Sequence, residues 1–335
     1  MQKFLIIQTA FIGDVVLATC LVEKLHRHFP DARIDFMVRK GNESLFNGHP
    51  YIHEVLVWDK KNGKLRNWWK LLLQIRRTGY DRVINVQRFA STGLLTAFSG
   101  ASQTIGFDKN PLSFLFSLKI SHQVGGQQGA VHEIDRNLAL VSGFTDSTRV
   151  MPRLYPTLQD EQWIQSLHLD RYITVAPASV WFTKQYPIEK WISFIGALPA
   201  HWQVCLLGGP ADKDLCSKIQ EACNPRKILN LCGTLSFLQS ASLMKSAAMN
   251  YVNDSAPLHF ASALNAPVTA VYCSTVPAFG FGPLSDRRFI VETKETLDCR
   301  PCGLHGYRAC PRGHFNCAWQ IRDDQLLETL ELPNP

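Results

Sequence analysis

The sequence predicts an α/β fold made of two Rossmann-like domains, each with a parallel sheet. Short runs rich in Val, Ile and Leu, such as "KFLIIQ" at 3–8 and "EVLVW" at 54–58, alternate with longer helical patterns. The alternation stops once, at the proline-spaced connection "MPRLYPTLQDEQW" over 151–163, and then restarts. Two βαβ arrays in series predict two sheets covered by helices on both faces. The 335 residues, 46% of them hydrophobic, are enough for two cores.

The individual elements follow from these patterns in chain order. In the first array we predict strands at 3–8, 32–38, 54–58 and 81–87, with helices starting near Asp14, Glu43 and Trp68. In the second array we predict strands at 172–177, 202–209, 227–233, 249–254 and 268–273. Ligands of such sheets bind at the carboxyl ends of the strands, so we expect two domains that face each other across a cleft. The predicted boundaries are 1–155, 156–322 and a C-terminal helix and tail at 323–335.

Hydropathy and charge limit the compartment and the binding partners that we expect for this protein. No apolar run reaches the ~20 residues of a membrane span and no targeting signal is visible, which predicts a cytoplasmic protein. The net charge of +7 gathers in residues 59–82, where eight Lys/Arg meet two Asp around Trp68 and Trp69. Such a basic helix suits an anionic membrane or an anionic acceptor, and the alternative is a solvated helix whose tryptophans face the core. Nucleic-acid binding would rest on charge alone, and we do not expect it.

The ten cysteines fall into two groups. Six occur singly in apolar patterns, as reduced core thiols do in a cytoplasmic protein: Cys20, Cys205, Cys216, Cys223, Cys232 and Cys273. The other four are Cys299, Cys302, Cys310 and Cys317, in a C-x2-C pair followed by two more spaced thiols. They could bind structural zinc, form disulfides or stay reduced, and we assign no metal.

An acidic residue, Asp14, stands where the first strand leads into the first helix. The loop "TAFIG" at 9–13 precedes it, and we expect its carboxylate to point into the inter-domain cleft. A simpler interpretation is an Asp that stabilises the helix dipole. A dinucleotide fingerprint would need three glycines, whereas this turn has only Gly13, so hydride transfer with a nicotinamide at this loop is not expected.

Two loops of the second array could hold an anion. In "VAPASVWFTKQYPIEKW", Lys184 lies before a helix that we expect to begin at Pro187, and a lysine beside helix-entry amides can hold a phosphate. In "NDSAPLHFASALNAPVTAVY", Asp254 or Ser255 is the expected helix cap, with free amides in the turn. The alternative roles are structural, with Asp254 as a cap and His259 as a packed helix residue.

Together these stretches occur in the order and spacing of one family. The stretches are "FIGDVVLAT", "HEIDRNLALVSGF", "PASVWFTKQYPIEKW", "NDSAPLHFASALNAPVTAVY" and "CRPCGLHGYRACPRGHFNC". The chain resembles the bacterial lipopolysaccharide heptosyltransferases of glycosyltransferase family 9, most closely the heptosyltransferase II branch, from about Lys3 to about Leu327. The resemblance implies a GT-B architecture, with an acceptor-binding N-terminal domain and a C-terminal domain that binds an ADP-sugar.

The resemblance also implies roles for particular residues. Asp14 matches the general base, with Thr9 and Gly13 in the acceptor-side loop. The donor-binding positions are Ser179, Lys184, Gln239, Asp254, Ser255, Ala256 and His259. The family inverts the anomeric centre without a metal or another cofactor. In agreement with this, we find no Asp-x-Asp pair placed for a metal-bridged diphosphate.

Three positions depart from the family pattern. Leu238 stands before Gln239 where relatives usually carry an acidic residue that contacts the donor ribose, so we do not expect that contact here. Ala256 followed by Pro257 replaces the usual glycine and removes one amide donor. The stretch "PAS" at 177–179 replaces "PGA", so a phosphate would approach a more crowded backbone, although Ser179 adds a hydroxyl.

The expected function is transfer of L-glycero-D-manno-heptose from ADP-heptose to a lipid-linked lipopolysaccharide core oligosaccharide, with inversion. We expect the enzyme on the inner face of the inner membrane, in peripheral contact with anionic lipid. One alternative is the same fold using another nucleotide sugar on another surface glycan. Another is a catalytically silent sugar-nucleotide-binding protein.

Overall fold

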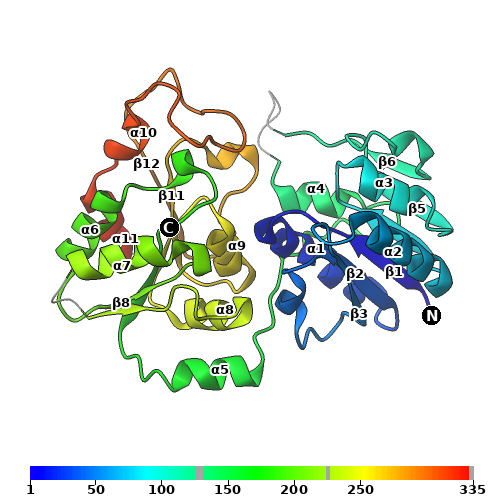
Figure 1. The fold of residues 1–335 in the computed structure, drawn as a ribbon, viewed down its shortest axis with the longest axis horizontal. Helices are drawn as coiled ribbons and strands as arrows, with labels where there is room; N and C mark the ends of the chain where they lie inside the picture. The colour runs from blue at the N-terminus through cyan, green and yellow to red at the C-terminus, as the bar shows by residue number, and fades with distance from the viewer. Residues whose placement is uncertain (125–130, 224–226, 332–335) are drawn as a thin grey trace. The chain divides into compact units, whose positions relative to one another are not determined.

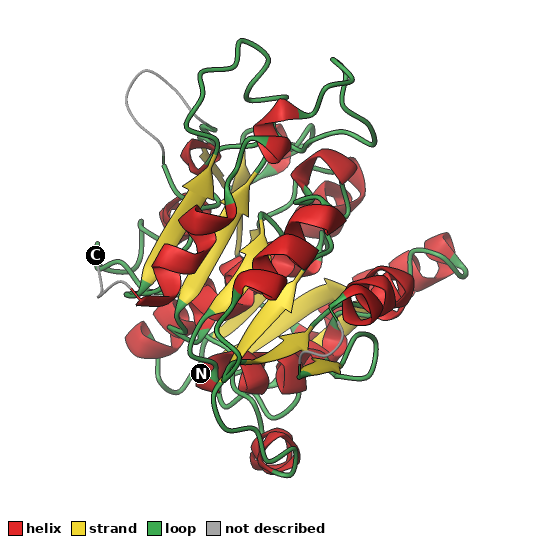
Figure 2. Ribbon diagram, turned by 90° about the vertical axis from the view of Figure 1, so that its left-hand side faces the viewer, coloured by secondary structure: helices red, strands yellow, loops and turns green. Residues whose placement is uncertain are grey.

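The computed structural model describes residues 1–124, 131–223 and 227–331 of the chain. The chain divides into two compact units, Met1–Tyr155 and Pro156–Pro335. Within the described residues each unit contains one six-stranded sheet, and every strand pair is parallel. Helices flank the strands (Figures 1 and 2). The predicted α/β fold class is confirmed.

The first unit is a doubly wound sheet with the strand order β3-β2-β1-β4-β5-β6. Its strands are β1 (Lys3–Ile7), β2 (Arg33–Arg39), β3 (Glu54–Trp58), β4 (Arg82–Asn85), β5 (Gln103–Phe107) and β6 (Leu118–Ile120). Its helices are α1 (Ile12–His28), η1 (Glu43–Phe46), α2 (Lys64–Thr78), α3 (Ala90–Ala97), η2 (Ser113–Leu115) and α4 (Glu133–Ala139).

Two helix starts in this unit differ from the predicted ones, and a third segment starts as predicted but is not an α-helix. The helix α1 begins at Ile12, so Asp14 lies in its first turn and does not start it. The segment from Glu43 forms only a four-residue 3-10 turn. The helix α2 begins at Lys64, directly after Gly63, whose left-handed φ of 61° turns the chain into the helix. The polar residues before Trp68 are typical of a loop, so the sequence pattern predicted too late a start for this helix.

The second unit repeats the same winding, with the order β12-β11-β10-β7-β8-β9. Its strands are β7 (Tyr172–Ala176), β8 (Gln203–Leu206), β9 (Ile228–Asn230), β10 (Asn250–Asn253), β11 (Val268–Tyr272) and β12 (Arg288–Glu292). Its helices are α5 (Leu158–Gln165), η3 (Phe182–Lys184), α6 (Ile188–Ala197), η4 (Pro210–Asp212), α7 (Lys213–Ala222), α8 (Phe237–Ser246), α9 (Ala256–Ala263), η5 (Pro277–Phe279), α10 (Asn316–Trp319) and α11 (Asp323–Glu331).

The C-terminal helix α11 is part of the second unit. It packs on α6, and Asp323 at its start accepts hydrogen bonds from Ser193 and Tyr186. Leu326 of α11 is fully buried in the same core as Trp191. The predicted tail residues 332–335 lie outside the described residues.

Apolar strand residues explain why the sheets form at these positions. β1 and β7 are central strands, and Leu5, Ile7, Ile173 and Val175 are all fully buried. Parallel strands covered on both faces are expected to be apolar throughout rather than alternating. The helices supply the other half of each core, for example Ile75 in the first unit. Among the described residues, no helix has the length and apolar content needed to cross a bilayer.

Candidate active site

The topology itself marks one ligand-binding edge in each unit. In both sheets the strand order reverses between two central strands, β1 and β4 in the first unit and β7 and β10 in the second. Open α/β sheets bind ligands outside the carboxyl ends of the strands at such a reversal point. The loop after β1 contains Thr9 and leads to Asp14, while the loops after β7 and β10 contain Lys184 and Asp254.

In the first unit, a cluster of cations surrounds the loop after β1. Thr9 is buried, and its carbonyl and hydroxyl oxygens accept hydrogen bonds from Lys60 Nζ at 3.0 and 2.9 Å. Burial lowers the pKa of Lys60 to about 8, and the positive charges of Arg39 and Lys64 add to the effect. This loop therefore lies in a positive potential that would attract an anionic acceptor.

Asp14 itself is half-buried in the first turn of α1. Its carboxylate lies within electrostatic range of Glu133, at the start of α4. Burial raises the pKa of Glu133, the Arg136 guanidinium opposes that rise, and the charge of Asp14 adds to it. Arg136 Nε donates to Glu133 Oε2 at 2.7 Å. The sequence predicted a role for Asp14 but none for Glu133 or Arg136, although both lie in "HEIDRNLALVSGF", one of the stretches that carry the family resemblance.

In the second unit, the structure brings Lys184 and Asp254 together. Lys184 Nζ lies 2.6 Å from Asp254 Oδ2, and their side chains are only 16% and 8% exposed. The same carboxylate oxygen accepts a hydrogen bond from Thr275 Oγ1 at 2.7 Å. The ammonium group is therefore held in one place, yet it has three donors and Asp254 uses one of them. A preorganised, partly buried cation of this kind is suited to a diphosphate.

Asn253, the last residue of β10, ties the two loops of this edge together. Its side-chain oxygen accepts a hydrogen bond from Tyr186 N at 2.9 Å, and its side-chain nitrogen donates to Pro177 O at 2.8 Å. Both partners flank the segment that carries Ser179 and Lys184. The end of β10 thus fixes the path of the loop after β7.

Thr183 anchors Lys184 from the other side. It is 1% exposed, and its hydroxyl oxygen accepts hydrogen bonds from Tyr307 N at 2.8 Å and Ser274 Oγ at 3.0 Å. Gly306 has a φ of +75°, and a Cβ there would lie 3.0 Å from Lys184 Cγ and from Thr183 Oγ1. The cysteine-bearing segment therefore supports the Lys184 loop, and the left-handed backbone and the close approach together favour glycine at position 306.

Arg300 extends this support to the end of β11. Its guanidinium donates to the carbonyl oxygens of Cys273 at 2.7 Å and Thr275 at 2.9 Å, and it pairs with Glu292 at 2.5 Å. The hydroxyl of Thr275 donates the hydrogen bond to Asp254 described above. We did not predict Thr183, Thr275 or Arg300, and no local pattern marks them, because each acts through partners distant in the chain.

The other residues predicted to bind the sugar donor lie at or near the start of α9. Ser255 is the N-cap residue, but its hydroxyl donates to Asn253 O at 3.3 Å and makes no side-chain cap bond. Ala256 and Pro257 occupy the first turn, and His259 is 6% exposed. The backbone at this turn adds to an anion-binding environment beside Lys184.

Two other predicted donor positions have structural partners. Gln239 forms a capping box with Ser236: its Oε1 accepts from Ser236 N at 2.9 Å, and its backbone N donates to Ser236 Oγ at 3.0 Å. Leu238, which replaces the usual acidic residue, is 3% exposed and lies in the core. Ser179 is half-buried, and its carbonyl accepts a hydrogen bond from Gln185 Nε2 at 2.6 Å.

The four tail cysteines lie close enough to influence one another. All ten cysteines of the chain fall within the described residues, and each is a free thiol there. Burial raises the pKa of Cys317 to about 12, and the thiols of Cys302, Cys310 and Cys299 add to the rise, opposed by Arg300. Within the described residues these thiols do not form a group of three or more ligand atoms spaced to hold one metal ion.

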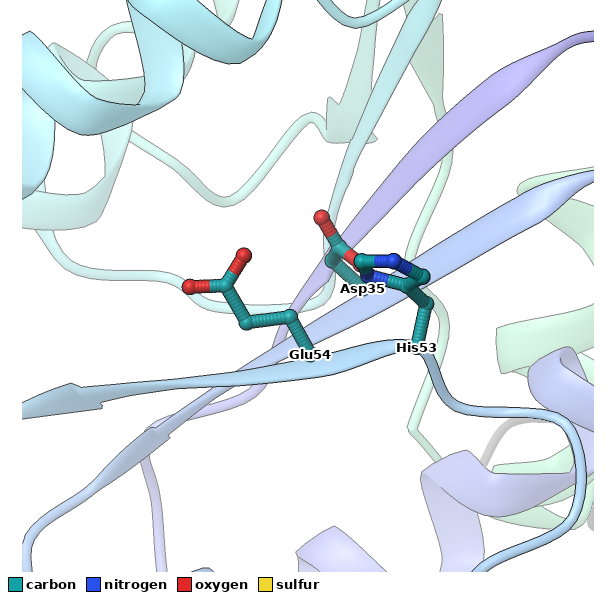
Figure 3. Close-up of side chains that lie close together, drawn as sticks. All are labelled: Asp35, His53 and Glu54. Carbon is teal, nitrogen blue, oxygen red and sulfur yellow. The ribbon is translucent and has the colours of Figure 1, made fainter.

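A cluster of two carboxylates and a histidine, away from the candidate site, has ligand atoms close enough together to hold a metal ion. Asp35, His53 and Glu54 lie at the beginning of β2 and β3, away from the carboxyl ends of the strands (Figure 3). Arg33 already bridges the two carboxylates, at 2.9 Å from Asp35 and 2.7 Å from Glu54. A metal ion would have to displace this guanidinium, so we regard the cluster as a structural ion-pair network.

Two such units, each a doubly wound parallel sheet with polar groups at its reversal point, make up the GT-B fold. The chain matches the family "Glycosyltransferase family 9 (heptosyltransferase)" over residues 68–305. The protein therefore belongs to glycosyltransferase family 9, as the sequence motifs predicted.

Individual relatives agree with this assignment. The chain is 25% identical to lipopolysaccharide heptosyltransferase 3 of Escherichia coli, covering 79% of this chain and 82% of that protein. Among solved structures, the Escherichia coli ADP-heptose lipopolysaccharide heptosyltransferase II superposes with a TM-score of 0.81 at 21% identity, over 99% of this chain and 98% of that one. The Escherichia coli heptosyltransferase WaaC with ADP gives a TM-score of 0.73 at 18% identity, over 98% and 99% of the two chains. At these identities the structural matches establish the fold alone, and placement in the heptosyltransferase II branch stays a prediction.

Proposed function

We propose that the protein transfers L-glycero-D-manno-heptose from ADP-heptose to a lipopolysaccharide core oligosaccharide, with inversion at the anomeric carbon. The observation that carries this proposal is the Lys184–Asp254 pair at the reversal point of the second sheet. It is supported by family membership and by relatives whose names specify ADP-heptose and lipopolysaccharide. The second unit would bind the donor and the first unit the acceptor.

The donor diphosphate would bind beside Lys184 and the first turn of α9. Lys184 keeps donors beyond the one used by Asp254, and Asp254 itself is shared with Thr275. When the bond between the anomeric carbon and the diphosphate breaks, ADP leaves with the electron pair and its charge grows. A fixed ammonium group and helix-entry amides stabilise this charge without further reorganisation.

The acceptor hydroxyl would attack the anomeric carbon from the face opposite the departing ADP. As the new carbon–oxygen bond forms, the hydroxyl proton passes to the carboxylate of Asp14, the general base. Glu133 lies within electrostatic range of Asp14, and Arg136, which pairs with Glu133, offsets the charge of that second carboxylate. Neutralisation of the leaving group by Lys184 would make a divalent metal unnecessary.

We further propose that the enzyme works in the cytoplasm, in peripheral contact with the membrane that holds its lipid-linked acceptor. The cationic surroundings of Thr9, made by Lys60, Arg39 and Lys64, support recognition of an acidic acceptor. Nucleic acid is not among the proposed partners.

A donor screen followed by a transfer assay tests this function. ADP-, GDP-, UDP- and CMP-sugars are compared at equal concentration for their ability to raise the unfolding temperature, because a ligand that binds the native state more tightly stabilises it more. We expect ADP-heptose to give the largest rise and to yield a heptosylated core oligosaccharide by mass spectrometry. A larger rise in unfolding temperature with another nucleotide sugar would show that ADP-heptose is not the donor. Donor binding without transfer to any core acceptor would favour a silent binding protein.

A further inference from the structure

The first unit carries an apolar groove that the proposed chemistry does not use. It lies between α2 and α3, which pack against each other, and encloses about 590 Å³. Six of its lining side chains define what we call the α2–α3 surface: Leu65, Trp68, Trp69, Leu72, Leu94 and Phe98.

Several of these side chains are exposed to an unusual degree for their size. Leu65 is 73% exposed, Trp69 59% and Phe98 50%. Trp68 is fixed in the groove wall, because its indole N–H donates to Ser91 O at 2.9 Å, and it meets Trp69 edge to face. Single exposed apolar residues need no explanation, but a contiguous group around a groove marks an interaction surface.

The charge around the groove specifies the kind of partner. The helix α2 carries Lys64, Arg66, Lys70, Arg76 and Arg77 and no acidic residue. Lys64 and Arg76 line the groove itself. The partner must therefore offer both apolar contact and negative charge. A helix with a basic polar face and Trp and Leu at its apolar edge is typical of proteins that lie in the interface of an anionic bilayer.

We propose that the α2–α3 surface docks the protein onto an anionic lipid bilayer. Leu65, Trp69 and Phe98 enter the boundary between headgroups and acyl chains, while the basic side chains of α2 contact lipid phosphates. This deepens the membrane contact of the proposed function and rests on it for its biological role. The docking itself needs neither donor nor acceptor.

The test uses the full-length protein and vesicles of phosphatidylcholine with or without phosphatidylglycerol. We expect co-sedimentation only with phosphatidylglycerol, falling as salt is raised. The substitutions Arg76→Gln and Arg77→Gln should each weaken partitioning about 5-fold, the effect of one basic side chain near an anionic surface. The double substitution Leu65→Ser/Trp69→Ser should weaken it at least about 10-fold, through lost apolar contact.

Matched controls and a depth probe separate insertion from surface attraction. Phe114 is 72% exposed outside the groove, and Phe114→Ser should leave partitioning unchanged. Lys218→Gln, on α7 of the second unit, is the charge control. Lipids brominated on the acyl chains should quench more tryptophan fluorescence in the wild type than in Trp69→Phe.

Four results would overturn the proposal: no binding to phosphatidylglycerol vesicles at low salt, equal binding by wild type and surface variants, losses as large in the controls, or no acyl-chain quenching. Transfer to a soluble, deacylated acceptor should be unchanged in Leu65→Ser/Trp69→Ser. If vesicle binding fails while this transfer persists, only the docking proposal fails. If vesicles are bound but no heptose is transferred, the proposed function fails instead.

Discussion

Removing the charge of Lys184 should have two separable effects, one on stability and one on donor binding. Lys184→Met leaves the carboxylate of Asp254, 8% exposed, without its cation at 2.6 Å. Breaking a buried pair by removing one partner typically costs 3–5 kcal/mol, and we expect about 3 kcal/mol because Lys184 is itself 16% exposed. Losing a charge-assisted contact to phosphate should cost a further ~1.5–3 kcal/mol of ADP affinity, about 10- to 150-fold in Kd.

The double variant Lys184→Met/Asp254→Asn separates these two effects. The introduced asparagine side chain carries no charge, and its oxygen could still accept the hydrogen bond of Thr275. Urea unfolding should therefore show most of the lost stability restored, while calorimetry should show ADP affinity as weak as in the single variant. The reasoning is refuted if the double variant regains donor affinity together with stability, because Lys184 would then serve only the ion pair. Wild-type stability in the single variant would equally contradict the buried pair.

Two further predictions concern the support of the site and its pH dependence. Gly306→Ala should raise the Kd for ADP, because the added Cβ would lie 3.0 Å from Lys184 Cγ and from Thr183 Oγ1. Gly143→Ala is the control, since its Cβ would meet open space and the Kd for ADP should not change. Equal ADP affinities of the two variants by calorimetry would contradict the role of Gly306. Burial lowers the pKa of His49 from 6.5 to about 4, so the unfolded chain binds the extra proton between these values and unfolding free energy should fall as pH drops from about 6.5 to 4. His49→Gln should flatten this part of the pH profile in urea unfolding, and an unchanged slope would assign the pH dependence to other groups.

Much of the fold could be predicted because most central strands are largely apolar. β1, β7 and β11 are buried almost throughout and are rich in apolar residues, whereas β10 is equally buried but begins and ends with asparagine. We did not predict β5, β6 and β12. β6 and β12 are the outer strands of their sheets, and β12 begins and ends with a charged residue, in "RFIVE".

β5 was missed for a different reason. Its sequence, "QTIGF", contains Gly106, which ordinarily weakens a strand. The structure explains the glycine, because a Cβ there would lie 2.5 Å from Cε2 of Phe116. The ring of Phe116 packs against the strand itself, and such a close approach between distant residues leaves no trace in a local pattern.

The candidate site could be predicted where its chemistry is local. Lys184 follows a predicted strand, Asp254 is the last residue of another, and a resemblance to known motifs singled them out. Their direct pairing could not be deduced, since about 70 residues of chain separate them. Arg300 and Thr183 act through backbone carbonyls and hydroxyls of other loops, so only the folded chain reveals them.

The measurement that tests the central claim most directly is the single-turnover rate of heptose transfer in Asp14→Asn, with ADP-heptose and a core acceptor at saturation. A general base contributes ~10²- to 10⁴-fold, and the account predicts a loss of that size with unchanged ADP affinity and unfolding temperature. Asparagine keeps the size of the side chain, and because the N-cap residue of α1 is Phe11, the substitution removes no capping bond and costs at most about 1 kcal/mol of charge–dipole interaction. A variant that keeps more than about a tenth of the wild-type rate, a barrier change below ~1.4 kcal/mol, would contradict the assignment of Asp14 as the base.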